Sequence, residues 1–135
     1  MTTPAVHLPD VLRRQIIHHC LCCLPNEGCG LIATDHDALV RVYPTANLDA
    51  SPTGYTVPPS EHMAALTDAE SNGWALGGVF HSHPSGAGVP SAVDMATALD
   101  PDWLYLVVSL VAETEVRGWR IRDGKPIEVT LVSAD

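Results

Sequence analysis

Two histidines, a serine and an aspartate lie within fourteen residues, in the segment from His81 to Asp94. The histidines His81 and His83 follow an apolar run, residues 74–80, that predicts a buried strand. Residues two apart on a strand point to the same face, so both imidazoles can turn a ring nitrogen toward one point. Because imidazole is a common zinc ligand, the spacing indicates half of a metal site.

The chain after His83 supplies a third ligand. Residues 84–90 are rich in Pro and Gly and predict a tight turn. Ser91 is a natural N-cap for a short helix running to about Leu99, which places Asp94 in the first turn, facing the two imidazoles. Two histidines and one carboxylate leave a fourth tetrahedral position open, as in catalytic zinc sites. We therefore expect one Zn²⁺ ion per chain, held by His81, His83 and Asp94.

Each of these residues has a plainer interpretation when taken alone. A His-x-His pair at a strand end is more often a surface or core pair than a pair of ligands. Asp94 is explained equally well as the reciprocal half of a capping box with Ser91. Neither interpretation accounts for the order of strand, turn and cap, which favours the metal site.

The same residues carry a resemblance to a known family. The order His81-Ser-His83-Pro, six residues, Ser91, two residues, Asp94 resembles the motif of the JAMM (MPN+) metalloproteases. That family adds an upstream glutamate in a Glu-x-Cys-Gly-Leu context, and this chain reads Glu27-Gly-Cys-Gly-Leu. The resemblance implies the cytidine-deaminase-like JAMM/MPN fold and makes Glu27, otherwise read as a solvated loop acid, a catalytic base.

The resemblance also implies an activity. JAMM relatives are zinc peptidases or isopeptidases that cleave the amide after the C-terminal Gly-Gly of a ubiquitin-like protein, and small prokaryotic members are associated with ThiS/MoaD-like sulfur carriers. The expected substrate is therefore a carrier–cysteine or carrier–lysine conjugate. Zinc lowers the pKa of bound water toward about 7. Glu27 would take the proton and pass it to the leaving amine, and Ser91 would stabilise the oxyanion if its hydroxyl leaves the cap.

The remaining elements predict an α/β fold with a mixed β-sheet flanked by helices. The periodicity favours helices over 8–24 and from an N-cap at Ser60 to about Ser71. Strands are expected at 29–34, 39–43, 103–110, 115–122 and 126–132, with hairpins joining the first two and the last two. The apolar run 103–110 is typical of a central strand buried on both faces.

The loop from Asn47 to Ser60 is rich in Pro, Ser, Thr and Gly. It contains Tyr55-Thr-Val57, which could form a short strand. Loops of this length beside a site often bind substrate, so Tyr55 and Val57 are the expected substrate-binding residues.

Length and composition bound the class of protein. A chain of 135 residues with 46% hydrophobic content predicts a single domain, residues 1–135. With 16 acidic against 7 basic residues, the net charge of −9 argues against nucleic-acid binding. The sequence lacks a long apolar run and a signal-peptide pattern at its start, so we expect no membrane association and a cytoplasmic protein. It does not indicate the oligomeric state.

The cysteines Cys20, Cys22, Cys23 and Cys29 raise the question of a second, structural zinc site. They lack the long spacer that usually separates two ligand pairs, so reduced thiols packed as small hydrophobes are the favoured interpretation.

Three other functions compete. A zinc nucleobase deaminase would need a Pro-Cys-x-x-Cys segment, and the chain has no Pro-Cys. A RadC-like domain has a similar His-x-His-Pro stretch, but the context of Glu27 favours the JAMM protease. A non-catalytic MPN-type binding module is the third, although this chain keeps the complete ligand set.

Overall fold

The computed structural model describes residues 5–98, 100–111 and 113–133. The helices are α1 (Asp10–Cys23), α2 (Pro59–Ser71) and α3 (Ala92–Thr97). The strands are β1 (Val6–His7), β2 (Cys29–Asp35), β3 (Ala38–Thr45), β4 (Ala75–His83), β5 (Leu104–Ser109), β6 (Glu115–Arg122), β7 (Lys125–Val129) and β8 (Leu131–Val132). None of the helices in the described part of the chain is long and apolar enough to cross a membrane.

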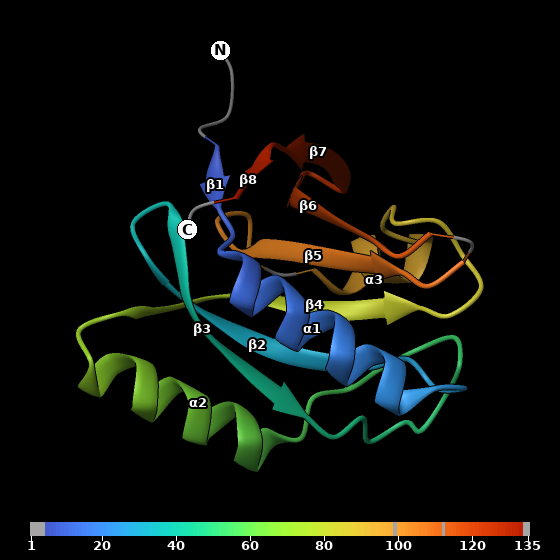
Figure 1. Ribbon diagram of the computed structural model, residues 1–135, viewed down its shortest axis with the longest axis horizontal. Helices are drawn as coiled ribbons and strands as arrows, with labels where there is room; N and C mark the ends of the chain where they lie inside the picture. The colour runs from blue at the N-terminus through green and yellow to red at the C-terminus, as the bar shows by residue number, and fades with distance from the viewer. Residues whose placement is uncertain (1–4, 99, 112, 134–135) are drawn as a thin grey trace.

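The strands form one mixed sheet in the order β7-β6-β5-β4-β2-β3-β1-β8 (Figure 1). Strands β4 and β5 run parallel, while β2 pairs antiparallel with both β3 and β4. Strands β7 and β8 are separated by Thr130 alone, yet they stand at opposite ends of this order. The sheet must therefore curl until its two edges approach each other. These observations confirm the predicted mixed sheet flanked by helices.

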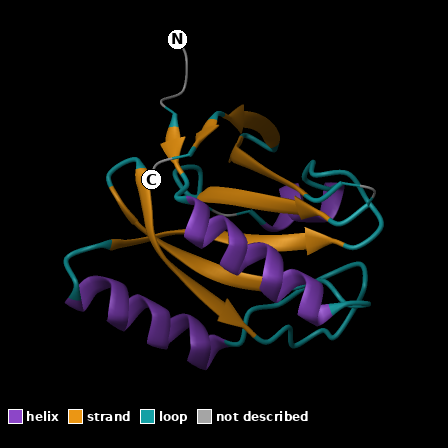
Figure 2. Ribbon diagram, viewed as in Figure 1, coloured by secondary structure: helices purple, strands orange, loops and turns teal. Residues whose placement is uncertain are grey.

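The two faces of the sheet carry separate cores. Helix α1 buries Leu12, Ile16 and Cys20, at i, i+4 and i+8, against the face that carries Phe80 of β4. Full burial of an aliphatic side chain contributes about 1.5–3 kcal/mol, so this stripe accounts for the docking of α1. Helix α2 packs Ala65 and other residues against the opposite face, where Met95 of α3 also packs. Figure 2 shows α1 on one side of the sheet and α3 on the other.

The secondary structure corrects several predictions. Helix α1 begins at Asp10, after Pro9 as its N-cap, and Leu8 precedes it although it belongs to the core. The predicted cap at Ser60 is wrong, because Pro58 is the N-cap of α2 and Pro59, with its fixed φ, occupies the first turn. Helix α3 ends at Thr97, and the predicted end at Leu99 lies outside the described residues.

Two strand predictions also change. The segment Tyr55–Val57 is not a strand, because its main chain is bonded within the loop: Leu48 N–H donates to Thr56 O, and Thr56 N–H donates to the Asn47 side chain. The strand predicted over 126–132 breaks at Thr130, where the chain leaves β6 and joins β1. The pairing with β1 depends on a partner far away in the sequence, which local periodicity does not reveal.

Candidate metal centre

Three donor atoms meet at the end of β4. The Nε2 atom of His81 lies 3.1 Å from His83 Nε2 and 3.0 Å from Asp94 Oδ2, and His83 Nε2 lies 3.1 Å from the same oxygen. Donors bound tetrahedrally to one zinc ion at about 2.0 Å would stand about 3.3 Å apart. The three side chains therefore form a group that can hold a metal ion.

Strand β4 and helix α3 supply these donors from two directions. His81 and His83 share the sheet face of Val79, which is the face toward α2 and α3. Asp94 stands at the third position of α3 in a capping box: its N–H donates to Ser91 Oγ at 3.1 Å, and Ser91 N–H donates to Asp94 Oδ2 at 2.8 Å. The capping and metal-donor interpretations of Asp94 are therefore compatible, because the same oxygen serves in both.

The two imidazoles are oriented differently. His83 Nδ1 donates to the carbonyl of Ala87 at 2.8 Å, which leaves the lone pair on Nε2, the atom that faces the cluster. His81 is stacked against the ring of Tyr55, with centroids 4.5 Å apart and planes inclined by 19°. Its Nδ1 is buried and has no hydrogen-bond partner among the described residues. Packing against Tyr55 therefore orients His81, whereas a hydrogen bond orients His83.

The electrostatics of the cluster favour the protonation state that a metal needs at Asp94 and His81, but not at His83. Burial raises the pKa of Asp94, but the two imidazoles in contact with its carboxylate outweigh this effect and hold that pKa well below its usual value. Burial lowers the pKa of His81. The bond to Asp94 raises the pKa of His83, so a proton and a metal compete for its Nε2. Metal binding at this cluster should weaken in acid for this reason.

Glu27 lies two residues before β2, the strand that pairs with β4, and reaches the donors from that neighbouring strand. Gly28 packs on α1 so closely that a Cβ there would lie 2.9 Å from Cys20 Cα. Because side chains alternate, Glu27 and Cys29 face the opposite way, toward the donors. Cys29 pairs with His81 in the β2–β4 ladder, and continuing that antiparallel register sets Glu27 across from His83.

Glu27 is buried, with 5% of the residue exposed. Burial raises its pKa to about 7. Its Oε1 atom has no hydrogen-bond partner among the described residues. A buried acceptor of this kind is costly unless a bound water or ligand donates to it. The residues present thus fit a metal site that has a proton acceptor beside it.

Two hollows lie near the donors, and the loop before α2 contributes residues to both. A cleft of about 200 Å³ is lined by Glu27, His83 and Ser91 together with Pro52, Thr53, Pro84, Ser85 and Gly86. An apolar pocket of about 330 Å³ has Tyr55 and Val57 in its wall, with Leu31, His62, Val79, Thr97, Asp100, Trp103 and Tyr105. The expected substrate-binding residues Tyr55 and Val57 therefore lie beside the site.

The hydroxyl of Ser91 can serve the cap and a ligand at the same time, which the sequence did not indicate. The cap uses an Oγ lone pair, which accepts from Asp94 N–H, and it does not consume the O–H donor. The hydroxyl can therefore donate to a ligand in the cleft without leaving the cap.

The cysteines form no second cluster of this kind. All four are free thiols, and burial raises the pKa of Cys20 to about 12 and that of Cys29 to about 11. Across residues 5–98, 100–111 and 113–133, His81, His83 and Asp94 are the one group of three or more such donors that can meet at an ion.

The fold and the site together define an α/β protein with a candidate metal centre at the end of a central strand. Residues 9–122 match the Prok-JAB family model, described as prokaryotic homologs of the JAB domain. The chain belongs to this family, which confirms the resemblance drawn from the motif.

Individual relatives agree with this assignment. A desampylase from Haloferax volcanii is 36% identical over 110 residues, covering 79% of each chain. A CysO-cysteine peptidase from Mycobacterium tuberculosis is 32% identical over 108 residues, covering 77% of this chain and 74% of the relative. The solution structure of a Desulfitobacterium hafniense protein superposes with a TM-score of 0.87 at 34% identity, covering 96% and 93% of the two chains.

Proposed function

We propose that the protein is a zinc-dependent peptidase or isopeptidase. Its substrate is a ubiquitin-like or ThiS/MoaD-like sulfur carrier, conjugated through its C-terminal Gly-Gly to cysteine or to a lysine side chain. The observation that carries the proposal is the convergence of His81, His83 and Asp94 across a cleft from buried Glu27. The names of the two relatives, a desampylase and a CysO-cysteine peptidase, support the choice of substrate.

In this proposal His81, His83 and Asp94 hold one zinc ion, which supplies Lewis-acid activation of water and of the scissile carbonyl. Glu27 accepts a proton from the attacking water, and the carboxyl so formed returns that proton to the leaving amine as the C–N bond breaks. A raised pKa suits this double use, because the carboxyl can both accept and release a proton near neutral pH.

Ser91 and Tyr55 complete the site. The free O–H of Ser91 donates to the oxygen of the scissile carbonyl as negative charge develops there, a contribution typically worth about 3 kcal/mol. Beside His81 and Asp94, Tyr55 and Tyr105 help to enclose a cavity of only about 30 Å³. A cavity of this size has no room for a large side chain, which suits a glycine next to the scissile bond.

The test is cleavage of a ThiS/MoaD-like carrier extended past its Gly-Gly by cysteine or by a lysine-linked peptide, followed by mass spectrometry. Wild type should cut after the second glycine, whereas chelator-treated protein and Glu27→Gln should not. Glu70→Gln, the same change at an exposed position on α2, is the matched control and should cleave normally. A zinc-loaded wild type that cleaves neither conjugate would contradict the proposal and favour a non-catalytic MPN-type binding module.

A further inference from the structure

Asn47, which begins the loop before α2, makes four side-chain hydrogen bonds that the sequence did not predict. Its Nδ2 donates to Glu27 O and to Gly54 O, both at 3.0 Å. Its Oδ1 accepts from Asp49 N–H at 3.0 Å and from Thr56 N–H at 3.1 Å. A side-chain amide offers two donor hydrogens and two acceptor lone pairs, so the hydrogen-bonding capacity of Asn47 is fully used.

These partners lie on both sides of the candidate centre. Gly54 and Thr56 flank Tyr55, whose ring is stacked on the imidazole of His81. Glu27 is the buried acid across from His83. One side chain therefore ties the main chain of the acid to the loop that holds the aromatic ring against a metal donor.

The main chain around Glu27 is fixed by a small set of residues. Glu27 N–H donates to Ser51 O at 2.8 Å, and Glu27 O accepts from Asn47. Gly28 N–H donates to Ser82 Oγ at 2.8 Å, and Gly28 O accepts from Ser82 N–H at 2.9 Å. Ser82 lies between the two histidine donors, so it fixes the acid to β4, whereas Asn47 fixes it to the Tyr55 loop.

We propose that Asn47 is a positioning residue: its amide sets the direction of the Glu27 carboxylate and of the Tyr55 ring. This inference rests on the proposed function for its consequence in catalysis. A displacement of about 1 Å at a reacting group can lower a rate about 100-fold, so loss of the amide should reduce turnover while leaving the metal donors intact. Because Tyr55 also lines the apolar pocket, substrate binding should weaken too.

The variants are Asn47→Ala and Asn47→Asp. The aspartate keeps both acceptor bonds but loses the two donor bonds, to Glu27 O and Gly54 O, so it separates the effect of the donor bonds from that of the acceptor bonds. Asn72→Ala and Asn72→Asp are matched controls, because Asn72 Nδ2 donates to the carbonyl of Asp68 at the end of α2. Ser82→Ala should lower kcat alone, since it frees Gly28 N–H without touching the Tyr55 loop.

Three readouts are needed: zinc content, amide hydrogen exchange of residues 27–28 and 47–57, and kcat and KM on the tailed carrier. For both Asn47 variants we expect one zinc per chain, faster exchange in those two segments, a 10–100-fold lower kcat and a several-fold higher KM. The Asn72 variants should match wild type in all three.

Unchanged exchange, or a kcat within twofold of wild type, would overturn the proposal. So would an equal loss of kcat in the Asn72 variants, or loss of zinc from the Asn47 variants. If wild type cleaves no tailed carrier, the proposed function fails by itself, and the exchange data still decide whether Asn47 holds the two segments.

Discussion

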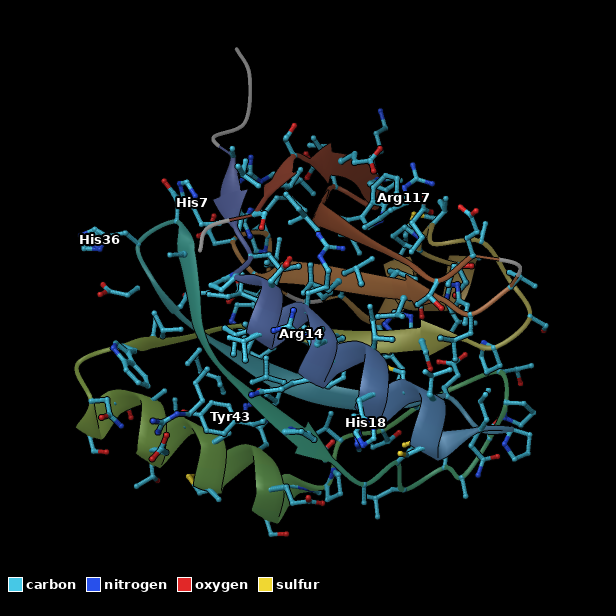
Figure 3. All side chains as sticks on the ribbon, in the orientation of Figure 1. His7, Arg14, His18, His36, Tyr43 and Arg117 are labelled. Carbon is cyan, nitrogen blue, oxygen red and sulfur yellow. The ribbon has the colours of Figure 1, made fainter. Side chains whose placement is uncertain are left out.

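The chain has two regions rich in metal donors, and they differ in what their donors bind. At the end of β4, the three donor atoms of His81, His83 and Asp94 stand 3.0–3.1 Å apart. On α1 the donors form two i, i+4 pairs, with 3.6 Å between His18 Nε2 and Cys22 Sγ and 3.7 Å between His19 Nε2 and Cys23 Sγ. Figure 3 labels His18, which is exposed on that helix.

The difference shows that convergence matters more than residue type. His19 Nε2 lies 3.1 Å from Cys29 O and 3.0 Å from Thr45 O. Carbonyl oxygens only accept, so this nitrogen carries a proton there and has no lone pair for a metal. His83 is arranged the other way, because its Nδ1 bonds a carbonyl and its Nε2 stays free. His81 also keeps its Nε2 free for the cluster, although stacking on Tyr55 holds that ring instead of a hydrogen bond. The predictions test the contrast between these two histidines and His19.

The largest effect should come from Asp94→Ala. It removes the oxygen that both imidazoles contact, together with the capping box of α3. We expect complete loss of zinc binding and of cleavage, measured by metal analysis and by mass spectrometry of the carrier. Asp102→Ala changes an exposed acid at a distance from the donors and should keep both. An Asp94→Ala protein that still held one zinc per chain would refute the ligand assignment.

Glu27→Gln should come next. The amide keeps the shape of the side chain but cannot accept a proton, and general acid–base groups typically contribute about 10²–10⁴-fold to the rate. We expect kcat to fall by that amount with zinc content unchanged. If the variant lost its zinc as well, Glu27 would be acting as a ligand.

The pH dependence of kcat/KM should report the ionisation of the Glu27 carboxylate. A base acts in its ionised form, so kcat/KM should fall about tenfold per pH unit below the pKa of Glu27. Burial raises that pKa to about 7, and a bound cation favours the carboxylate and lowers it. The acid limb of the wild-type profile should therefore lie between about pH 4.5 and 7. An identical limb in Glu27→Gln would assign the titration to another group.

A smaller effect is expected at the apolar pocket. Val57→Ser makes one wall of that pocket polar without touching the donors. KM for the tailed carrier should rise several-fold with kcat nearly unchanged, because the change weakens ground state and transition state alike. Tyr55→Leu should lower kcat as well, since the ring also orients His81. The opposite result, a lower kcat and an unchanged KM in Val57→Ser, would argue against substrate binding at Val57.

The smallest effect should come from the other donor-rich region. Cys22→Ser and His18→Gln alter an exposed pair on α1. We expect zinc content and activity to equal those of wild type, measured on the same preparations as Asp94→Ala. Loss of half a zinc or more per chain in either variant would remove the contrast between the two regions.

The sequence predicted the elements that depend on local pattern. His81, His83, Ser91 and Asp94 follow one another along a strand, a turn and a helix start, so their convergence could be expected from spacing. Glu27 required the family resemblance, because its place depends on the register between β2 and β4, strands far apart in the sequence. The contact between Tyr55 and His81 and the hydrogen bonds of Asn47 depend on how the loop folds back, which composition alone does not specify.

The account is tested most directly by X-ray absorption at the zinc edge of the purified, zinc-loaded protein. Ligation by His81, His83 and Asp94 predicts a first shell of nitrogen and oxygen at about 2.0 Å. It also predicts no zinc–sulfur distance near 2.3 Å, the value for a cysteine ligand. A sulfur shell at full occupancy would bring a cysteine of α1 or Cys29 into the ligand set and contradict the assignment of the ligands to His81, His83 and Asp94.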